Sequence, residues 1–592
     1  MSTTSPAYLA ARRLYDQGRL DECRVSLQRA ISRTPGDADL NTLMGGVLVE
    51  MGRPEQALYF LERAAASPSG GEIARSILGE AQMHSGRLED AERSFRSVIA
   101  SVPSSYSPRI NLANLLIRRG VLDEAEEHLR HAAAARPDLF QAYNNLALLL
   151  LDSGRSDEAA ALVREKASSQ PNDPAINRCL ANILNYVDEQ RPGESLAAHR
   201  IHGEWIERAA QAARVPSGGH SNFPDPDRRL RIAYLSPDFR EHSVAYFIEP
   251  VMRRHDRERF EVFAYSNAAA PDARTEVFKS IADHWRDIAR TGDTSAAGMI
   301  RADQIDILVD LAGLTHNNRL GLLALKPAPV QMSYCGYPST TGLSAVDYRL
   351  VDQVTDPPGS ESRCVERLLY LRPPGSFSCY APPPGMPEPA PLVTGTPVVF
   401  GSFNVLSKVT PPVVETWCRI LTQCPGSRLV LKARSLAEPS VRRRYAESFA
   451  SRGIDRDRVE LLGPLPGVAD HLAVYGRVAI ALDPFPYNGT TTTYEALWMG
   501  VPVVTLAGIT HAGRVGASIL TALGEPLLIA RNTDDYVRTA CELAADLSRI
   551  NTYRTTLRGR LGSSPLCDAE GYTRRLEEAL RIAWSCWCGS TR

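Results

Sequence analysis

The sequence lacks any long apolar run, any excess of charge and any sign of a secretory leader. Its apolar runs, such as residues 146–151, are far shorter than the ~20 residues that a membrane-spanning helix needs. The first ten residues contain no basic stretch followed by an apolar one, so we expect a cytoplasmic protein. A net charge of −1 favours neither a nucleic acid nor an anionic membrane as a partner.

Paired-cysteine motifs and common nucleotide-binding loops are also missing. The eleven cysteines include no C-x-x-C pair, and no second pair or nearby histidine accompanies Cys586 and Cys588. This pattern predicts reduced thiols and no metal site. No G-x-G-x-x-G or G-x-x-x-x-G-K-[ST] follows any expected strand, which disfavours dinucleotide oxidoreductases and P-loop NTPases.

What the sequence does contain is a 34-residue repeat over residues 5–172. Glycines recur at this spacing, each is followed five residues later by a small residue, and prolines recur near the same period. The glycine column consists of Gly18, Gly52, Gly86, Gly120 and Gly154. The period is that of the tetratricopeptide repeat, a helix-turn-helix unit in which glycine ends the first helix. We expect about five repeats whose concave face binds protein, although a purely scaffolding or dimerising role is the alternative.

After residue 172, the pattern of the 592-residue sequence predicts two further domains of alternating strands and helices. A helical extension and linker should occupy residues 173–228, with residues 216–226 rich in proline and glycine. Strands are expected in a first half, 229–392, and in a second half, 393–592. They are placed at residues 230–235, 260–265, 305–311, 330–334, 398–403, 428–432, 459–462, 478–482 and 503–506. Two Rossmann-like domains facing a cleft are the predicted fold, with ligands outside the carboxyl ends of the strands.

The strongest motif follows the expected strand 478–482 and reads DPFPYNGTTTTYEALWMG from Asp483. A tight turn at Asn488 and Gly489 leads into a helix whose first residues are threonines. They are Thr490, Thr491, Thr492 and Thr493. Hydroxyl and backbone N–H groups at a helix start form an anion site suited to a diphosphate, and Glu495 could accept hydrogen bonds from a ribose. The alternative is a threonine-capped helix and nothing more.

Four other motifs also follow expected strands or fill polar loops. Asn404 and Lys408 lie in GSFNVLSKVTP, where the lysine is placed to neutralise phosphate oxygens. His242 begins a helix in SPDFREHSVAYF. The remaining candidates for the cleft are Asp310, Gly313, Thr315, His316, Tyr337 and Pro338. A lysine placed after a strand in this way is as often functional as a solvated surface charge, whereas a single histidine such as His316 is more often structural than catalytic.

In this order, and behind tetratricopeptide repeats, these motifs resemble glycosyltransferase family 41, the O-GlcNAc transferase family. The segments HSVAYFIEP, HNNRLG, PAPVQ, GYPSTTGL, NGTTTTYEALWMGVPVVTLAG and HAGRVGASIL are most similar to its SPINDLY branch of protein O-fucosyltransferases. The resemblance covers nearly the whole chain. It implies a GT-B fold and an inverting transfer of sugar from a nucleotide co-substrate to Ser or Thr of proteins. It implies no metal and no other cofactor.

The resemblance also implies roles for individual residues. Lys408 matches the lysine that binds the donor diphosphate, and His242 matches the histidine beside the reacting centre. The threonines from Thr490 match the phosphate-binding segment, Glu495 the acidic residue that holds the ribose, and His471 a histidine near the nucleobase. The implied partners are a nucleotide sugar and a protein acceptor bound partly by the repeats, and a homodimer is left open.

Three functions remain open at this point. UDP-GlcNAc is the family's default donor, GDP-fucose or another activated sugar is the alternative, and a repeat-based adaptor without activity is the third. The sequence departs from O-GlcNAc transferases, which tend to have His at Thr490, Asp at Glu495 and Arg at Val474. Many relatives also have His where this chain has Leu314.

Overall fold

The computed structural model describes residues 5–67, 71–187, 191, 193–212, 219–375, 377–383, 385–393 and 395–590. Residues 213–218, which include the start of the predicted linker, lie outside that description. The chain divides into two compact units, Met1–Leu149 and Leu150–Arg592. Among the described residues, no helix combines the length and the apolar character needed to cross a bilayer.

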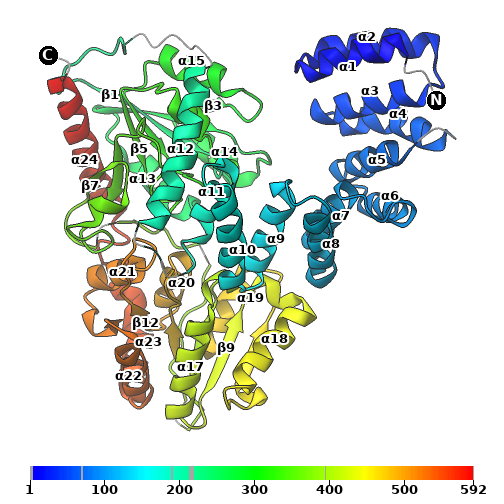
Figure 1. The fold of residues 1–592 in the computed structure, drawn as a ribbon. Coiled ribbons are helices and arrows are strands. Elements are labelled where there is room, and N and C mark those ends of the chain that lie inside the picture. The colour runs from blue at the N-terminus through cyan, green and yellow to red at the C-terminus, as the bar shows by residue number, and fades with distance from the viewer. Residues whose placement is uncertain are drawn as a thin grey trace. The chain divides into compact units, whose positions relative to one another are not determined.

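The first unit is a series of helical hairpins, as the 34-residue period predicts (Figure 1). Its helices are α1 (Pro6–Asp16), α2 (Leu20–Arg33), α3 (Ala38–Glu50), α4 (Pro54–Ala66), α5 (Glu72–His84), α6 (Leu88–Ser101), α7 (Ser107–Arg119), α8 (Leu122–Ala135) and α9 (Phe140–Asp152). The glycines of the predicted column all adopt the left-handed conformation, with φ from 69° to 82°. They therefore make the turns between paired helices, where a residue with a Cβ atom would be strained.

Small residues allow the two helices of a hairpin to approach closely. A Cβ atom added to Gly45 of α3 would lie 2.3 Å from Cγ of Leu61 on α4, and one on Gly79 of α5 would lie 2.6 Å from Cε1 of Phe95 on α6. Leu61 and Phe95 are fully buried. Each hairpin is thus held by a large side chain of the second helix packed against a small residue of the first.

The second unit begins with helices α10 (Ser156–Ser169), α11 (Pro174–Ile183) and α12 (Glu194–Ala212), followed by a first α/β half. Within the described residues its sheet has seven parallel strands in the order β3-β2-β1-β4-β5-β6-β7. The strands are β1 (Leu230–Ser236), β2 (Phe260–Ser266), β3 (His284–Asp287), β4 (Ile307–Asp310), β5 (Val330–Ser333), β6 (Tyr348–Val351) and β7 (Arg367–Tyr370). The helices of this half are α13 (Ala245–Arg254), α14 (Ala273–Ile281), α15 (Asp293–Ala302) and α16 (Leu320–Ala324).

The second α/β half carries six parallel strands, again counted over the described residues, in the order β10-β9-β8-β11-β12-β13. These are β8 (Val399–Ser402), β9 (Arg428–Lys432), β10 (Val459–Leu462), β11 (Ile480–Leu482), β12 (Val503–Leu506) and β13 (Ile529–Ala530). The helices are α17 (Pro411–Gln423), α18 (Pro439–Ala450), α19 (Val468–Ala473), α20 (Thr491–Trp498), α21 (Val515–Leu523), α22 (Thr533–Ala544), α23 (Leu547–Gly562) and α24 (Ala569–Ser590). The predicted pair of parallel α/β domains is confirmed, while β3, β6, β7 and β13 were not predicted.

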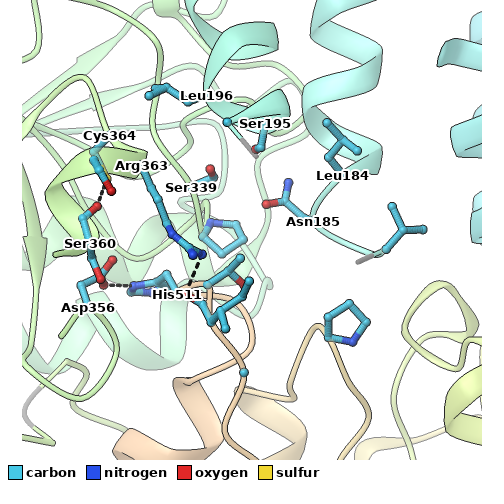
Figure 2. A pocket seen from close by; sticks show the side chains of 18 of the residues that line it. Leu184, Asn185, Ser195, Leu196, Ser339, Asp356, Ser360, Arg363, Cys364 and His511 are labelled. Carbon is cyan, nitrogen blue, oxygen red and sulfur yellow. Dashed lines mark hydrogen bonds and ion pairs between the residues drawn. The ribbon is translucent and has the colours of Figure 1, made fainter. Parts of the chain in front are cut away.

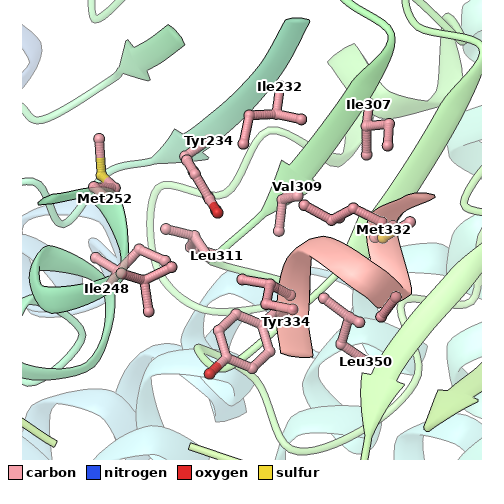
Figure 3. Close-up of a cluster of buried hydrophobic side chains, with 14 of the residues drawn as sticks. Ile232, Tyr234, Ile248, Met252, Ile307, Val309, Leu311, Met332, Tyr334 and Leu350 are labelled. Carbon is pink, nitrogen blue, oxygen red and sulfur yellow. The ribbon is translucent and has the colours of Figure 1, made fainter. Parts of the chain in front are cut away.

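The core of the first half explains why its central strands are largely apolar. Ile232, Ile307 and Val309 on neighbouring strands are buried together with Ile248 of α13 and Met332 of β5 (Figure 3). A parallel sheet covered by helices on both faces hides every side chain of a strand, so apolar residues need not alternate with polar ones. The last helix, α24, drawn in red in Figure 1, returns to this core through Tyr572, Leu580 and Trp584.

Candidate functional site

Lys408 ends a single helical turn (Leu406–Lys408) between β8 and α17. Its Nζ donates a hydrogen bond to the main-chain oxygen of Asn488 at 2.7 Å and lies 3.8 Å from the centre of the Tyr487 ring. Burial lowers the pKa of Lys408 to about 8, although the neighbouring Asp483 carboxylate opposes this shift. The ammonium group is therefore held in a poorly hydrated position where an anion would stabilise its charge.

Asp483, the residue directly after β11, holds the turn at Asn488 and Gly489 in place. The Asp483 carboxylate accepts hydrogen bonds from Gly489 N–H at 2.6 Å and from the Thr505 hydroxyl at 2.7 Å. Burial nevertheless raises the pKa of Asp483 to about 7. The Asn488 side chain is fully buried and donates to the carbonyl of Pro484 at 2.9 Å. The turn before the threonines is therefore rigid.

The threonine segment forms the start of α20. In the described structure Thr490 occupies the N-cap position without making a side-chain capping bond. The Thr492 hydroxyl donates to Asn404 Oδ1 at 3.0 Å, which joins the segment to the loop after β8. Thr493 N–H already bonds to the carbonyl of Thr490, whereas the N–H groups of the first helix residues have no intrahelical acceptor. Simple capping does not account for the four threonines, and an open helix start lies beside Lys408.

Glu495, one turn further along α20, lies next to His471 of α19. His471 Nε2 is 3.1 Å from the Glu495 carboxylate, and its Nδ1 is 2.8 Å from Nζ of Lys432. The lysine must donate a hydrogen bond to Nδ1. The imidazole proton is therefore on Nε2, which donates a hydrogen bond to the Glu495 carboxylate. Lys432 was missed by the sequence analysis, although it is the last residue of a predicted strand. Burial lowers its pKa.

Asp310, Gly313 and Tyr337 come together at the carboxyl end of β4. Asp310 accepts a hydrogen bond from Gly313 N–H at 2.6 Å, and its other oxygen is buried without a partner among the described residues. Burial raises the pKa of Asp310 to about 7. Gly313 has a φ of +54°, and a Cβ atom there would lie 2.4 Å from Cβ of Tyr337. Glycine is therefore required for the tyrosine to pack over this turn.

The helical extension also reaches this cluster, which the sequence did not predict. His199 of α12 has its Nδ1 2.7 Å from the carbonyl of Ser195 and its Nε2 2.9 Å from the Tyr337 hydroxyl. The same hydroxyl accepts a hydrogen bond from Asn185 at 3.0 Å. The next residue, Tyr186, packs against Tyr487 with ring centres 5.0 Å apart. These contacts span more than a hundred residues of sequence and connect the Asp310 cluster to the Lys408 loop.

His242 precedes α13, and its Nδ1 accepts a hydrogen bond from Val244 N–H at 3.3 Å. Burial lowers the pKa of His242, and the nearby Asp238 carboxylate opposes this effect. The helix that His242 precedes packs on α20 through Phe247 and Tyr494, whose ring centres are 5.7 Å apart. The start of α13 therefore lies near the threonine segment.

For the two other candidates, Thr315 and His316, the described part of the chain shows no hydrogen bond or ion pair to the other site residues. The Thr315 hydroxyl is occupied by a 2.8 Å hydrogen bond to the carbonyl of Ala312, and His316 is exposed. Within the described residues no group of three or more His, Cys, Asp or Glu side chains is arranged to hold a metal ion.

A cavity lies next to these residues, but few of the predicted site residues line it. It has a volume of about 430 Å³ and is lined by the helical extension, the loop after Tyr337 and the segment before His511 (Figure 2). Pro338 is the only predicted site residue in its lining. Its buried charges are paired, because the Asp356 carboxylate lies 2.5 Å from His511 Nδ1 and 3.3 Å from Arg349. The Asp356–His511 pair joins the two α/β halves.

Two parallel α/β sheets, with a half-buried lysine and an open helix start at the carboxyl ends of the second, define the class of GT-B-type glycosyltransferases. Residues 198–377 and 392–576 match Glycosyl transferase family 41, and residues 8–72, 48–106, 82–144 and 141–165 match tetratricopeptide repeats. The chain belongs to glycosyl transferase family 41.

Known proteins agree with this assignment. A structure of a Thermobaculum terrenum O-GlcNAc transferase mutant is 36% identical, covers 88% of this chain and 98% of its own, and superposes with a TM-score of 0.79. A Petunia hybrida protein named probable UDP-N-acetylglucosamine--peptide N-acetylglucosaminyltransferase SPINDLY is 42% identical over 70% of this chain. An Arabidopsis thaliana protein named probable UDP-N-acetylglucosamine--peptide N-acetylglucosaminyltransferase SEC is 30% identical over 61% of this chain. This chain spans 44% and 38% of the lengths of these two relatives.

Proposed function

We propose that this protein transfers a sugar from a nucleoside diphosphate donor to a Ser or Thr hydroxyl of other proteins. The observation that carries the proposal is the meeting of the Lys408 ammonium with the open start of α20. Lys408 Nζ bonds to the carbonyl of Asn488, three residues before the helix begins. A fixed cation and unpaired N–H groups are the groups that stabilise a leaving diphosphate.

In the proposed reaction the acceptor hydroxyl attacks the anomeric carbon from the face opposite the diphosphate. The new C–O bond forms as the bond to the diphosphate breaks, which inverts the anomeric centre, and the proton of the acceptor hydroxyl is released to solvent. Lys408 supplies countercharge as that bond breaks, and we therefore expect activity in the presence of EDTA. Because His242 Nδ1 accepts a backbone hydrogen bond, its neutral form carries the proton on Nε2. We assign His242 to hydrogen-bond donation toward the reacting groups rather than to proton abstraction.

UDP-GlcNAc is the donor that we propose first, because the relatives' names specify it. GDP-fucose is the alternative, and two observations favour keeping it. The chain is more similar to proteins named SPINDLY than to one named SEC. Its residues Thr490, Glu495 and Val474 also depart from the O-GlcNAc transferase pattern around the Lys432–His471–Glu495 network. An adaptor without activity has less support, since Lys408 and the four threonines are all present.

We also propose that the repeats bind the protein acceptor. The structure indicates which residues a deletion should remove to test this proposal. Helix α10 belongs to the second unit, where the Ser156 hydroxyl donates to the carbonyl of Ser407 at 2.9 Å. A deletion of residues 1–172 would therefore remove support from the loop that carries Lys408. Deletion of residues 1–138 leaves α9 and α10 in place, and it should abolish transfer to proteins while nucleotide affinity changes less than about twofold.

The test is transfer of radiolabelled sugar from UDP-GlcNAc or GDP-fucose to proteins of a heat-treated extract, with and without EDTA. Label that alkaline β-elimination releases from the proteins supports the proposal and identifies the donor. Absence of transfer from both donors, combined with absence of UDP and GDP binding by calorimetry, would contradict it and favour the adaptor.

A further inference from the structure

Two cysteines of the second α/β half lie side by side and are accessible to small reagents. Cys424 caps the end of α17 and Cys541 lies in the last turn of α22. Their thiols interact with each other, and both side chains are partly exposed. Most of the other cysteines of the chain are buried.

The packing of α17 against α22 also indicates that these two thiols lie close together. Arg419 of α17 forms a 2.6 Å ion pair with Asp534 of α22, near the contact of the Trp417 indole with the Tyr536 hydroxyl. From the ion pair, Cys424 lies five residues along α17, about 7.5 Å of axial rise, and Cys541 lies seven residues along α22, about 10.5 Å. Both helices belong to the α/β half built on one parallel sheet and run opposite to its strands, so they run in the same direction and both thiols reach nearly the same level.

The two thiols differ in a way that suits thiol–disulfide exchange. The interaction with Cys541 lowers the pKa of Cys424, and the Arg458 guanidinium, which bonds to the Cys424 carbonyl at 3.2 Å, acts in the same direction. Because the interaction with Cys541 stabilises the Cys424 thiolate, Cys424 is the nucleophile of the pair, and the same contact raises the pKa of Cys541.

We propose that Cys424 and Cys541 form a reversible disulfide that links α17 to α22. The Cys424 thiolate attacks a low-molecular-weight disulfide such as oxidised glutathione, which gives a mixed disulfide and releases one glutathione thiolate. Cys541 then loses its proton and attacks Cys424 Sγ, which forms the protein disulfide and releases the second glutathione. Two protein thiols are oxidised and one external disulfide is reduced to two thiols, so electrons and protons balance.

The location gives the bond a structural consequence. Trp417 donates to the Tyr536 hydroxyl, and Tyr536 in turn donates to the main-chain oxygen of Asp483 at 3.0 Å. The disulfide would therefore clamp the layer of helices beneath the Asp483 turn, and it would close a long loop in the unfolded chain. We expect the oxidised protein to have a melting temperature several degrees higher than the reduced protein.

The experiment uses the full-length protein equilibrated in glutathione buffers of increasing oxidised-to-reduced ratio, quenched with iodoacetamide and mapped by non-reducing peptide mass spectrometry. We expect a peptide linked through Cys424 and Cys541 that dithiothreitol removes. Cys379 and Cys567 are the internal control. They also interact electrostatically, but Cys379 is fully buried and burial raises the pKa of both to about 12. They should remain alkylatable after denaturation.

Cys424→Ser and Cys541→Ser should each abolish the crosslink and the redox dependence of the melting temperature while leaving the melting temperature of the reduced protein within about two degrees. The proposal is overturned if wild-type Cys424 and Cys541 stay fully alkylatable in the most oxidising buffer. It is also overturned if the oxidised and reduced wild-type proteins melt at the same temperature despite a complete crosslink, because the clamp would then be absent.

Discussion

The large cavity beside His511 and the segment around Lys408 differ in how their charges are satisfied. In the cavity, Asp356 is already paired with both His511 and Arg349. In the Lys408 segment, the ammonium bonds to a single carbonyl and lies beside an open helix start. The crevice bounded by Asn404, Asp483 and Thr492 has a volume of only about 10 Å³, room for no more than one water molecule.

The comparison shows that the volume of a cavity and the availability of its charged groups to a ligand are separate properties. The cavity has space, but its charged groups stabilise one another and hold the two α/β halves together. The Lys408 segment has little enclosed space, but its cation and N–H groups are available to an anion resting on its outer edge. We therefore place the diphosphate at Lys408, and four predictions sharpen or break this distinction.

Replacing Lys408 by methionine should have the largest effect. The substitution keeps the apolar stem and removes a charge whose contribution grows as the diphosphate departs. We expect kcat to fall by about 10²–10³, or about 3–4 kcal/mol, and nucleotide affinity to fall less. Steady-state kinetics checks this, with Lys279→Met as the matched control, because Lys279 pairs with Glu276 at the surface of the first half. A rate above about half that of the wild type would remove Lys408 from the site.

Replacing His511 by alanine should affect stability instead of chemistry. The change leaves the buried Asp356 carboxylate with Arg349 as its remaining charged partner and opens space beneath Phe377, which packs edge-on against the His511 ring at 4.6 Å. We expect the free energy of unfolding to fall by about 2 kcal/mol. Denaturant titration measures this loss, and the folded variant should keep its rate within about threefold. A loss of rate as large as that of the lysine variant would place the chemistry in the cavity.

The pH dependence of nucleotide binding should follow Lys408. Its pKa is lowered to about 8, so the ammonium form that binds a diphosphate is lost as pH rises through 8. Affinity should therefore be nearly constant from pH 7 to 7.5 and fall by up to about tenfold per pH unit above 8.5. Calorimetric titration of UDP and GDP between pH 7 and 9.5 measures this slope. An identical slope in Lys408→Met would assign the titration to another group.

Replacing Arg363 by alanine should have the smallest effect. This exposed side chain lines the cavity and donates to the main-chain oxygen of Ile509 at 2.7 Å. We expect changes in stability below about 0.5 kcal/mol and unchanged nucleotide affinity. Thermal melts and calorimetry check both, and a tenfold loss of affinity would mean that the cavity holds part of the donor.

The sequence predicted those features that depend on local pattern. The repeats followed from turn glycines such as Gly52, and strands such as β1 and β9 followed from apolar runs bounded by turns. β3 (HWRD) and β7 (RLLY) were not predicted because their residues are charged and half-exposed. Both are edge strands, which only pairing with a neighbouring strand defines. β13 is only two residues long.

The candidate site shows the same division. Asn404, Lys408 and the threonines were found because each follows a strand, and the structure brings them together. Lys432 also ends a strand and could have been found by the same rule. His199 and Asn185 could not, because they reach Tyr337 only through the packing of α11 and α12 on the first half, which no local pattern encodes.

The most direct test of the account is an experimental structure of the protein with UDP or GDP bound. We predict that the diphosphate lies within hydrogen-bond distance of Lys408 Nζ and of the backbone N–H groups of Thr491 and Thr492, outside the crevice. A diphosphate bound in the cavity between Arg363 and His511, with Lys408 still bonded only to Asn488, would contradict the account.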